Sequence, residues 1–537
     1  MTQALNWRSR VVSGIAVLAS LAAVVACLAT SAFADSPIVT EQGPLRGIVT
    51  AGIREYLGIP YAASPAGKLR WMPPQSPAHF NGVFQAAHFG SACPQRDQNN
   101  VLIGSEDCLF LNVYTPNTEP PAHGFPVMLY FYGSGFNDGA GSLYDPTPMV
   151  KKGGVIVVTI NYRLGVLGFL AHPALDAEGH LNANYAVMDQ QSALTWLRKN
   201  IGAFGGDKNR ITLFGQSAGA ICVLSQLISP LTAGTFQRAI VQSEVFVGFQ
   251  DYLSAILSLA DAEAFGTGFA TTVGCTDQTA KCLRAVPVSV LVDTGVPYFP
   301  QTVVDGAVIT QSWQSAIESG VFNRVPVMIG TNHDELRIFL AGNYDYVGNP
   351  LTDPNYPAEV SSFIGLPVDN PFIQYLVNVA YPLSNFPPPP GVMSAPLAAS
   401  ALETDLLVSC PGRNVDIALS RYVPTYAYEF NDENAPLNPP TTPASFPLGA
   451  YHGAELQYLF SFTSNPPLTA DQQQLSDKMI GYWTHFAKTG DPNSSGSPTW
   501  SPYSAVTDQI QSLVPPTPVV ESTFDSDHQC STLWNTF

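Results

Sequence analysis

Short apolar runs bounded by turn-forming residues recur along the chain and alternate with helical patterns. The clearest strand-like runs are Val127–Tyr132, Val155–Ile160, Ile211–Phe214 and Val325–Gly330. Between them, Val187–Asn200 places apolar residues on one side of a helix. Strands that alternate with helices favour a mostly parallel sheet with both faces covered. The pattern therefore predicts an α/β fold with a central twisted sheet.

Two stretches interrupt this alternation. Residues Asn343–Pro357 and the proline run Phe386–Gly391 have no regular period, and consecutive prolines favour a stiff extended segment. Such excursions either line a pocket or form surface loops, and the sequence leaves both open. No internal repeat or disordered linker divides residues 35–537, so we expect a single domain there.

The N-terminus has the pattern of a secretory signal peptide. Arg8 and Arg10 precede the apolar run Val11–Leu28, and Ala32-Phe33-Ala34 forms an A-x-A cleavage site. A membrane anchor is the weaker interpretation, because no cationic flank follows the run. We expect residues 1–34 to be removed and the mature chain to be secreted or periplasmic.

A second cleavage site lies within the same apolar run. Val24-Val25-Ala26-Cys27 fits a lipoprotein signal, and cleavage there would leave Cys27 at the new N-terminus. The rest of the chain has no apolar run long enough to cross a bilayer. We therefore expect no transmembrane segment in the mature chain.

The chain is strongly acidic. Its 41 Asp and Glu residues against 23 Lys and Arg give a net charge of −18, and loss of Arg8 and Arg10 with the signal peptide makes it −20. This balance argues against nucleic acid and anionic membranes as partners. Hydrophobic residues make up 46% of the chain and charged residues 12%, as in a globular rather than a disordered protein.

Seven cysteines lie outside the signal peptide, an odd number. In an exported protein they predict disulfides and one free thiol, but six paired cysteines allow about 15 connectivities. No group of cysteines and histidines has the spacing of a metal site, so we predict no metal and no cofactor. The seven are Cys93, Cys108, Cys222, Cys275, Cys282, Cys410 and Cys530.

The most informative motif follows one of the predicted strands. Ile211–Phe214 leads into Gly215-Gln216-Ser217-Ala218-Gly219, a G-x-S-x-G pattern, and small helix-forming residues come next. A strand, a sharp turn and a helix around such a serine form the nucleophile elbow of an α/β-hydrolase. The turn is too tight for bulk at Gly215 and Gly219, and it lifts the Ser217 hydroxyl clear of the backbone.

A serine nucleophile needs a base and an acid, which in this fold class follow it in the order acid, then histidine. Four of the nine histidines follow Ser217. His452 lies in a glycine-flanked loop, from which an imidazole can reach across a pocket. His485 lies in what reads as a packed helix, His528 is close to the C-terminus, and His333 adjoins the candidate acids.

Two neighbouring carboxylates are candidates for the acid. Asp334 and Glu335 closely follow the strand Val325–Gly330, and α/β active sites lie at the carboxyl ends of strands. Chemistry alone does not separate the two. Oxyanion donors are expected in Tyr132–Phe136, because its glycines let backbone N–H groups turn toward one point.

Several longer motifs extend over most of the chain. They are L-G-I-P-Y-A at 57–62, L-R-W at 69–71, S-E-D-C-L-F-L-N at 105–112, N-Y-R-L-G at 161–165, D-Q-Q-S-A-L-T-W at 189–196, N-I-G-A-F-G-G-D at 200–207 and F-A-K-T-G-D-P-N at 486–493. With these motifs the chain resembles the type-B carboxylesterase family, which includes carboxylesterases, cholinesterases and some secreted lipases. The resemblance runs from about Ser36 to the C-terminus.

The resemblance implies an α/β-hydrolase fold with large loop and helix insertions around the active site. It implies Ser217 as the nucleophile, Glu335 of an N-x-D-E motif as the acid, and His452 of a G-x-x-H-G-x-E motif as the base. The implied oxyanion donors are the backbone N–H groups of Ser134, Gly135 and Ala218. The implied disulfides are Cys93–Cys108, Cys275–Cys282 and Cys410–Cys530, which leaves Cys222 free and buried.

The chain departs from the family pattern beside the implied active site. Ser134 replaces the middle of three glycines, so its hydroxyl either faces the pocket as an extra donor or is merely tolerated. Glu244, after Ser243, stands where the family usually has glycine. Its carboxylate either recognises a polar or cationic group of the substrate or pairs with an arginine. Together with Gln216, these residues suggest part of the substrate pocket.

Two differences argue against choline esters as substrates. Cholinesterases hold a quaternary ammonium on aromatic rings, with a key tryptophan in the loop that the first disulfide closes. Between Cys93 and Cys108 this chain has no Trp, Tyr or Phe, and neutral Gln216 stands where cholinesterases carry Glu. General or bulky neutral esters fit the sequence better.

The sequence therefore predicts a secreted serine hydrolase that cleaves small-molecule carboxylic esters through an acyl-enzyme. One alternative is a secreted lipase that acts on acylglycerols. Another is a non-catalytic adhesion or binding relative of the family. The oligomeric state stays open.

Overall fold

The structure is a computed structural model of the chain. The signal peptide expected at residues 1–34, with the alternative site at Cys27, lies outside the described residues except for Ala32 and Phe33. The described residues are 32–33, 36–181, 183–244, 256–295, 302–437 and 443–534.

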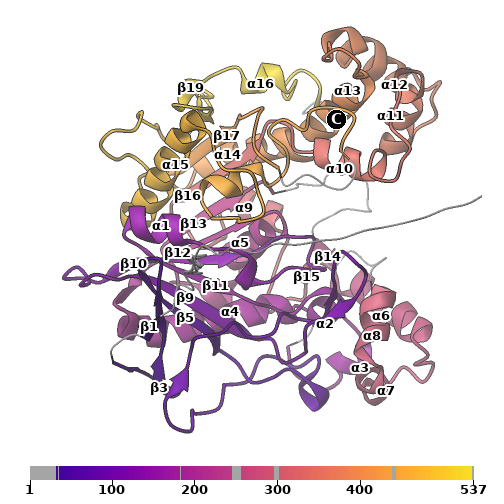
Figure 1. Ribbon diagram of the computed structural model, residues 1–537. Coiled ribbons are helices and arrows are strands. Elements are labelled where there is room, and N and C mark those ends of the chain that lie inside the picture. The colour runs from indigo at the N-terminus through magenta and orange to yellow at the C-terminus, as the bar shows by residue number, and fades with distance from the viewer. Residues whose placement is uncertain are drawn as a thin grey trace, which may run out of the picture.

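One twisted sheet of 12 strands forms the centre of the described part (Figure 1). From β11 through β10, β12, β13, β16 and β17 to β18, neighbouring strands run parallel. Antiparallel strands extend the sheet at both ends. In spatial order the strands are β1 (Ala32–Phe33), β4 (Ile48–Thr50), β5 (Ile53–Pro60), β9 (Phe110–Pro116), β11 (Ile156–Ile160), β10 (Phe125–Phe131), β12 (Gly206–Gln216), β13 (Arg238–Gln242), β16 (Val327–Asn332), β17 (Thr425–Phe430), β18 (Ile510–Leu513) and β19 (Val519–Glu521).

The four runs predicted as strands are β10, β11, β12 and β16, all in the parallel part of this sheet. Each is buried along most of its length, because helices cover both faces. The predicted α/β class is therefore confirmed. Three smaller sheets lie outside the main one. Their strands are β2 (Ile38–Thr40), β3 (Gly43–Arg46), β6 (Phe84–Gln85), β7 (Gln95–Arg96), β8 (Leu102–Ile103), β14 (Ile256–Ser258) and β15 (Thr302–Val304).

Helices α1 and α15 cover one face of the sheet, and α4, α5, α9 and α14 cover the other. Two outer groups, α6 to α8 and α10 to α13, lie at the periphery (Figure 1). The helices are α1 (Thr147–Gly153), α2 (Gly165–Phe169), α3 (Pro173–Asp176), α4 (Tyr185–Asn200), α5 (Ala218–Ile228), α6 (Leu259–Thr272), α7 (Ala280–Ala285), α8 (Val288–Gly295), α9 (Trp313–Ser319), α10 (Arg337–Asn343), α11 (Tyr356–Ile364), α12 (Pro371–Tyr375), α13 (Ala395–Thr404), α14 (Cys410–Ser420), α15 (Ala470–Thr489) and α16 (Phe524–Asp527). Among the described residues, no helix combines the length and apolar character that a membrane span requires.

The two irregular stretches of the sequence differ in structure. Residues Asn343–Pro357 contain the end of α10, a short 3₁₀ turn at Asp353–Asn355 and the start of α11. The proline run Phe386–Gly391 forms no helix or strand.

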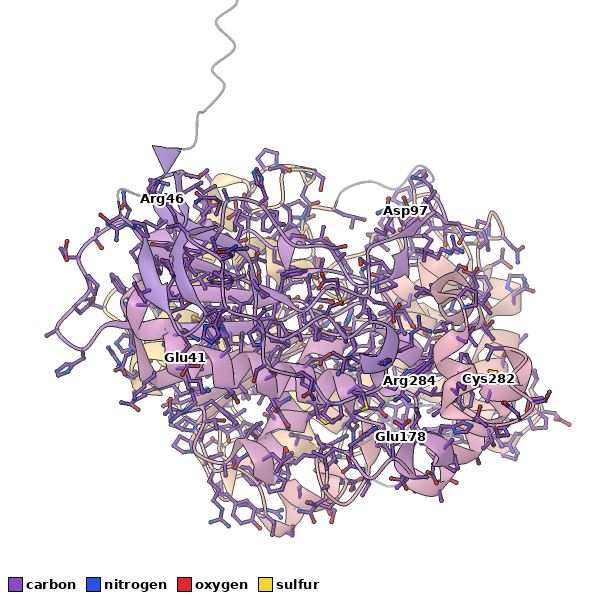
Figure 2. The ribbon with its side chains drawn as sticks, turned by 90° about the horizontal axis from the view of Figure 1, so that it is seen from below. Glu41, Arg46, Asp97, Glu178, Cys282 and Arg284 are labelled. Atoms are coloured by element: carbon purple, nitrogen blue, oxygen red, sulfur yellow. A yellow bond between two sulfur atoms is a disulfide. The ribbon has the colours of Figure 1, made fainter. Side chains whose placement is uncertain are left out.

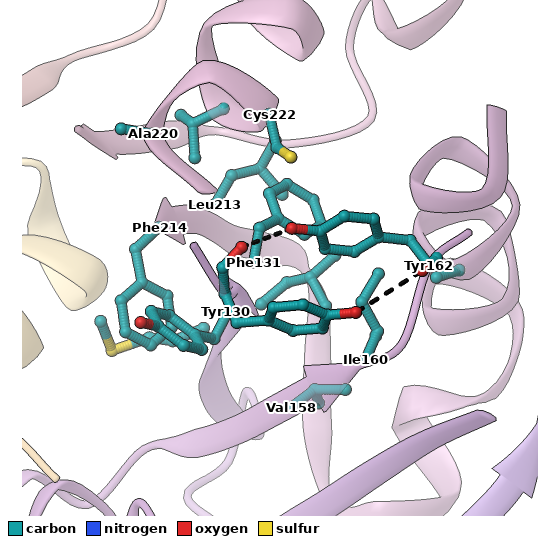
Figure 3. Packing of buried hydrophobic residues seen from close by; sticks show 14 of the residues in the cluster. Tyr130, Phe131, Val158, Ile160, Tyr162, Leu213, Phe214, Ala220 and Cys222 are labelled. Carbon is teal, nitrogen blue, oxygen red and sulfur yellow. Dashed lines mark hydrogen bonds between the residues drawn. The ribbon is translucent and has the colours of Figure 1, made fainter. Parts of the chain in front are cut away.

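The main core lies between the parallel strands and the helices that cover them. Tyr130, Phe131 and Phe214 are fully buried on β10 and β12, and Cys222 of α5 is 1% exposed (Figure 3). The buried Tyr162 hydroxyl donates to the Tyr132 carbonyl oxygen, in the loop that follows β10. The strands that lead to the predicted site are thus held in a densely packed interior.

The described cysteines form the three disulfides that the family resemblance implied, and Cys222 remains free and buried. The short Cys275–Cys282 bridge ends in α7, a peripheral helix. Arg284 of the same helix donates two hydrogen bonds to Glu178, at 2.5 and 2.7 Å (Figure 2). The Cys410–Cys530 bridge fastens the C-terminal segment to the start of α14.

Candidate active site

The elbow predicted at Gly215–Gly219 joins β12 to α5. Ser217 has φ 58° and ψ −127°, a strained conformation for a residue that carries a Cβ. A Cβ on Gly215 would lie 2.3 Å from the Gly219 carbonyl oxygen, and a Cβ on Gly219 would lie 2.0 Å from the Phe131 carbonyl oxygen. The glycines of the motif are therefore a packing requirement of the turn that presents Ser217.

The loop that follows β10 lies against this elbow. Ser134, Gly135 and Phe136 have φ angles of 76°, 59° and 62°, so three consecutive residues occupy the left-handed region. A Cβ on Gly133 would lie 2.9 Å from the Ser217 Cβ. The backbone of this loop is consequently as close to the serine as packing allows.

Three backbone N–H groups beside Ser217 have no hydrogen-bond acceptor among the described residues: those of Ser134, Gly135 and Ala218. Ala218 is the first residue of α5, where amides lack an intrahelical partner. Free N–H groups next to a nucleophile can stabilise the negative charge that develops on a carbonyl oxygen.

The Ser134 side chain has a partner of its own. It is exposed, and its hydroxyl donates to the Asp138 carboxylate. The hydroxyl is thus not an extra donor to the pocket, which was one of the two possibilities that the sequence raised. Position 134 can serve the site only through its backbone.

Glu335 and His452 meet beyond the carboxyl end of β16. Glu335 Oε2 lies 2.5 Å from His452 Nδ1, and Glu335 Oε1 accepts the Asn332 backbone N–H at 2.8 Å. Burial alone would lower the pKa of His452, but the Glu335 carboxylate raises it above its ordinary value. The contact assigns the proton to Nδ1 and leaves the lone pair on Nε2.

His452 Nε2 faces the elbow. The buried Gln216 amide lies 3.1 Å from this nitrogen and donates an N–H to it. The Ser217 hydroxyl has no hydrogen bond among the described residues. Glu335 therefore orients the imidazole through Nδ1, while Gln216, the residue before the serine, hydrogen-bonds to Nε2.

Asp334, the other candidate acid, has different partners. Its carboxylate pairs with Arg337 at 2.7 Å and with His333 at 3.0 Å, and it accepts the Ala450 backbone N–H at 2.9 Å. The structure thus separates two neighbours that chemistry alone left open: Glu335 contacts His452, and Asp334 anchors the surrounding loops.

Two other candidate histidines also have their own partners. His485 of α15 contacts the Asp491 carbonyl oxygen at 2.8 Å. His528 is buried between Asp405 and Glu429. Burial would lower the pKa of His528, but these two carboxylates raise it well above its usual range.

Ser243 and Glu244 follow β13, beside the elbow strand. The Glu244 side chain is 1% exposed, and neither of its carboxyl oxygens has a hydrogen-bond partner among the described residues. Burial raises the pKa of Glu244 well above its usual range. In the described part no arginine pairs with it, so the ion pair considered from the sequence is not formed there.

The arrangement combines a serine on a strained elbow, an oriented imidazole and unpaired N–H groups, the parts needed for nucleophilic attack on a carbonyl carbon. The model of the carboxylesterase family matches residues 34–531.

The chain belongs to the carboxylesterase family.

Its relatives include the pyrethroid hydrolase Ces2a of Mus musculus, 31% identical over 493 residues that cover 86% of this chain and 85% of the relative. The para-nitrobenzyl esterase of Bacillus subtilis (strain 168) is 30% identical over 491 residues, covering 87% and 92%. Carboxylesterase 5A of Felis catus is 32% identical over 523 residues, covering 89% and 91%. The protein is a carboxylic-ester hydrolase that acts on small-molecule esters.

This carboxylesterase has a further buried acid behind the Glu335–His452 pair. Glu455 accepts hydrogen bonds from Asn332 Nδ2 at 2.8 Å and from Gln242 Nε2 at 3.2 Å. Burial raises the pKa of Glu455 to about 7, although the Asn332 hydrogen bond opposes the shift. The sequence analysis gave Glu455 no role. Its place as the final residue of the G-x-x-H-G-x-E motif was the signal that could have identified it.

Proposed function

We propose that this carboxylesterase cleaves its substrate through a Ser217–Glu335–His452 triad and an acyl-enzyme intermediate. His452 Nε2 takes the Ser217 proton while the oxygen attacks the ester carbonyl, and it then donates that proton to the departing alcohol. Water attacks the acyl-enzyme by the same route. The observation that carries the proposal is the 2.5 Å contact between Glu335 Oε2 and His452 Nδ1, because it orients Nε2 toward the elbow.

The tetrahedral oxyanion would be held by the backbone N–H groups of Ser134, Gly135 and Ala218. These groups have no hydrogen-bond acceptor among the described residues, which supports this role because their N–H bonds remain available to an oxyanion. Removing one such donor typically raises the barrier by about 3 kcal/mol.

Neutral, bulky esters are the proposed substrate class. Gln216, next to Ser217, is neutral, and burial of Glu244 raises its pKa and so disfavours a negative charge that would attract a cationic group. The loop between Cys93 and Cys108 also lacks an aromatic ring to hold an ammonium. The names of two relatives refer to pyrethroids and to para-nitrobenzyl esters, which fits this class.

The proposed location is outside the cytoplasm. The signal-peptide pattern at residues 1–34 and three disulfides fit an oxidising compartment. N-terminal sequencing of the exported protein should begin at Asp35. A lipid-modified start at Cys27 would identify a lipoprotein instead.

The triad is tested by Ser217→Ala, assayed with p-nitrophenyl acetate. We expect kcat to fall by about 10⁴-fold or more, with the circular dichroism spectrum unchanged, because the nucleophile is lost and the fold is not. The matched control is Ser225→Ala on the same helix, whose hydroxyl donates only to the Ile221 carbonyl. It should keep kcat within about twofold.

Labelling with a serine-directed phosphonate separates the remaining alternatives. The wild-type enzyme should carry one label, on Ser217, and Ser217→Ala should carry none. Turnover by folded Ser217→Ala, or a label on another residue, would overturn the triad. A wild-type protein with neither turnover nor label would be a non-catalytic relative, and activity that rises sharply above substrate solubility would indicate a lipase.

A further inference from the structure

Three side chains from distant parts of the chain converge beside the loop of the candidate acid. His333 follows β16, Glu429 lies on β17, and His528 directly follows α16 in the C-terminal segment. One nitrogen or oxygen atom of each lies within 4.8 Å of the others. Strand pairing places Glu429 opposite the end of β16, because Thr331 and Glu429 are partners in the register.

Both imidazoles have a carboxylate at Nδ1. His528 Nδ1 contacts Asp405 Oδ1, and His333 Nδ1 lies 3.0 Å from Asp334 Oδ1. This leaves Nε2 as the second nitrogen of each ring, and His528 Nε2 already lies 2.7 Å from Glu429 Oε1. Histidines that bind metals typically have this arrangement, in which an outer carboxylate holds one nitrogen and fixes the other for the ion.

The outer carboxylates are themselves held in place. Asp405 accepts a hydrogen bond from the Tyr381 hydroxyl at 2.6 Å, and the Trp534 indole donates to that hydroxyl at 2.7 Å. Asp334, the outer carboxylate at His333, pairs with Arg337 at 2.7 Å. The orientation of both rings is therefore fixed by partners that lie outside the cluster.

The inner carboxylate is oriented as well. Asn431 Nδ2 donates to Glu429 Oε2 at 2.9 Å, which leaves Oε1 directed at His528. Glu429 and His528 are 1% and 3% exposed, whereas 39% of the His333 side chain is exposed. His333 is therefore the one residue of the cluster with substantial contact with solvent, and the other two are buried.

We propose that His333 Nε2, Glu429 Oε1 and His528 Nε2 bind a divalent transition-metal ion, with Zn²⁺ the best match to the donor set. Two imidazoles and one carboxylate suit Zn²⁺, and three protein ligands leave a fourth position for water. His528 and Glu429 would exchange their direct hydrogen bond for bonds to the ion. The ion would tie the loop that carries Glu335 to the C-terminal segment.

The competing explanation of the cluster is a buried ion-pair network. The two explanations differ in whether His333 takes part. Asp405, His528 and Glu429 alone would form such a network without any contribution from His333. Metal binding, in contrast, requires His333 as a ligand. The test therefore rests on His333, which is also the least buried of the three and the safest to replace.

The first experiment measures Zn²⁺ binding to tag-free, chelator-treated full-length protein by equilibrium dialysis. We expect one Zn²⁺ per chain, and at least about tenfold weaker binding by His333→Asn. The matched control is His180→Asn, because His180 also lies beside a carboxylate, Glu178 at 3.0 Å, but belongs to no such cluster among the described residues. Wild-type protein that binds no stoichiometric Zn²⁺, or equal Kd values for the two variants, would overturn the proposal.

The second experiment needs no variant. Diethyl pyrocarbonate modifies accessible imidazoles, and mass spectrometry locates the modified residues. Zn²⁺ should protect His333 of the wild-type protein and leave the modification of His180 unchanged. Equal modification of His333 with and without Zn²⁺ would contradict the site, whether or not His333→Asn folds.

Discussion

Two histidines of this carboxylesterase have the same kind of first partner, a carboxylate, and different kinds of second partner. His452 Nδ1 contacts Glu335, and His528 Nδ1 contacts Asp405. The other nitrogen of His452 receives an N–H from neutral Gln216, whereas that of His528 faces the Glu429 carboxylate. A histidine–carboxylate pair is therefore not sufficient to identify a base, because the second nitrogen decides what the ring can do.

The pKa values of the two histidines differ because the rings contact different numbers of carboxylates. Burial lowers the pKa of both imidazoles, and the neighbouring carboxylates raise it again. One carboxylate in contact raises the pKa of His452 above its ordinary value, while Asp405 and Glu429 together raise that of His528 well above it. His452 thus keeps one nitrogen that no carboxylate contacts. His528 faces a carboxylate at each nitrogen, which favours a bound proton or, in the proposed site, a metal ion at Nε2.

The largest expected difference is between the same substitution at the two sites. His452→Asn should lower kcat/KM by about 10⁴-fold or more, because the base is lost. His528→Asn should lower the free energy of unfolding by about 3–5 kcal/mol, because it leaves two buried carboxylates unpaired. Its kcat per folded molecule should fall by less than about tenfold.

Steady-state kinetics and urea denaturation measure the two effects on both variants. Loss of turnover by a folded His528→Asn protein, comparable to that of His452→Asn, would break the distinction between the two rings.

Glu244 extends the comparison to a buried carboxyl that has no imidazole or other hydrogen-bond partner among the described residues. Its pKa is raised in the folded protein, so above about pH 4.5 the folded state binds more protons than the unfolded state, and stability falls as pH rises. Glu244→Gln removes this loss. Relative to wild type, the variant should gain about 1.4 kcal/mol per pH unit above pH 4.5, as long as the folded carboxyl stays protonated.

Urea denaturation at a series of pH values measures this gain. The exposed Glu119→Gln is the matched control and should show no such slope. A Glu244→Gln protein that tracks wild type at every pH would mean that the carboxyl is solvated or paired in solution.

The sequence predicted the fold and the elbow because both are encoded locally. Apolar runs marked β10, β11, β12 and β16, and the glycines around Ser217 are required by contacts within the turn itself. The choice between Asp334 and Glu335 could not be made from residue chemistry, although the family resemblance implied Glu335. It depends on which of two adjacent side chains faces the His452 loop, a property of the tertiary structure.

The histidine cluster was missed for the same physical reason. His528 and Glu429 are 99 residues apart in the chain, so no spacing rule for metal ligands applies to them. Only the register of β17 against β16 and the position of the C-terminal segment bring them to His333. The direction of the Ser134 hydroxyl likewise follows from loop geometry that the sequence pattern does not specify.

The smallest expected effect comes from making His452 more like His528. Gln216→Glu would place a carboxylate at the second nitrogen of His452 and so raise its pKa further. A histidine base works only when neutral, so kcat/KM falls as pH drops through this pKa. The acid limb of the kcat/KM profile should therefore move up by roughly one pH unit, which lowers activity about tenfold on that limb.

Gln216→Met, neutral and of similar length, should leave the limb in place. An unmoved limb in Gln216→Glu would show that residue 216 does not contact the base in the working enzyme, and that the two histidines differ for another reason.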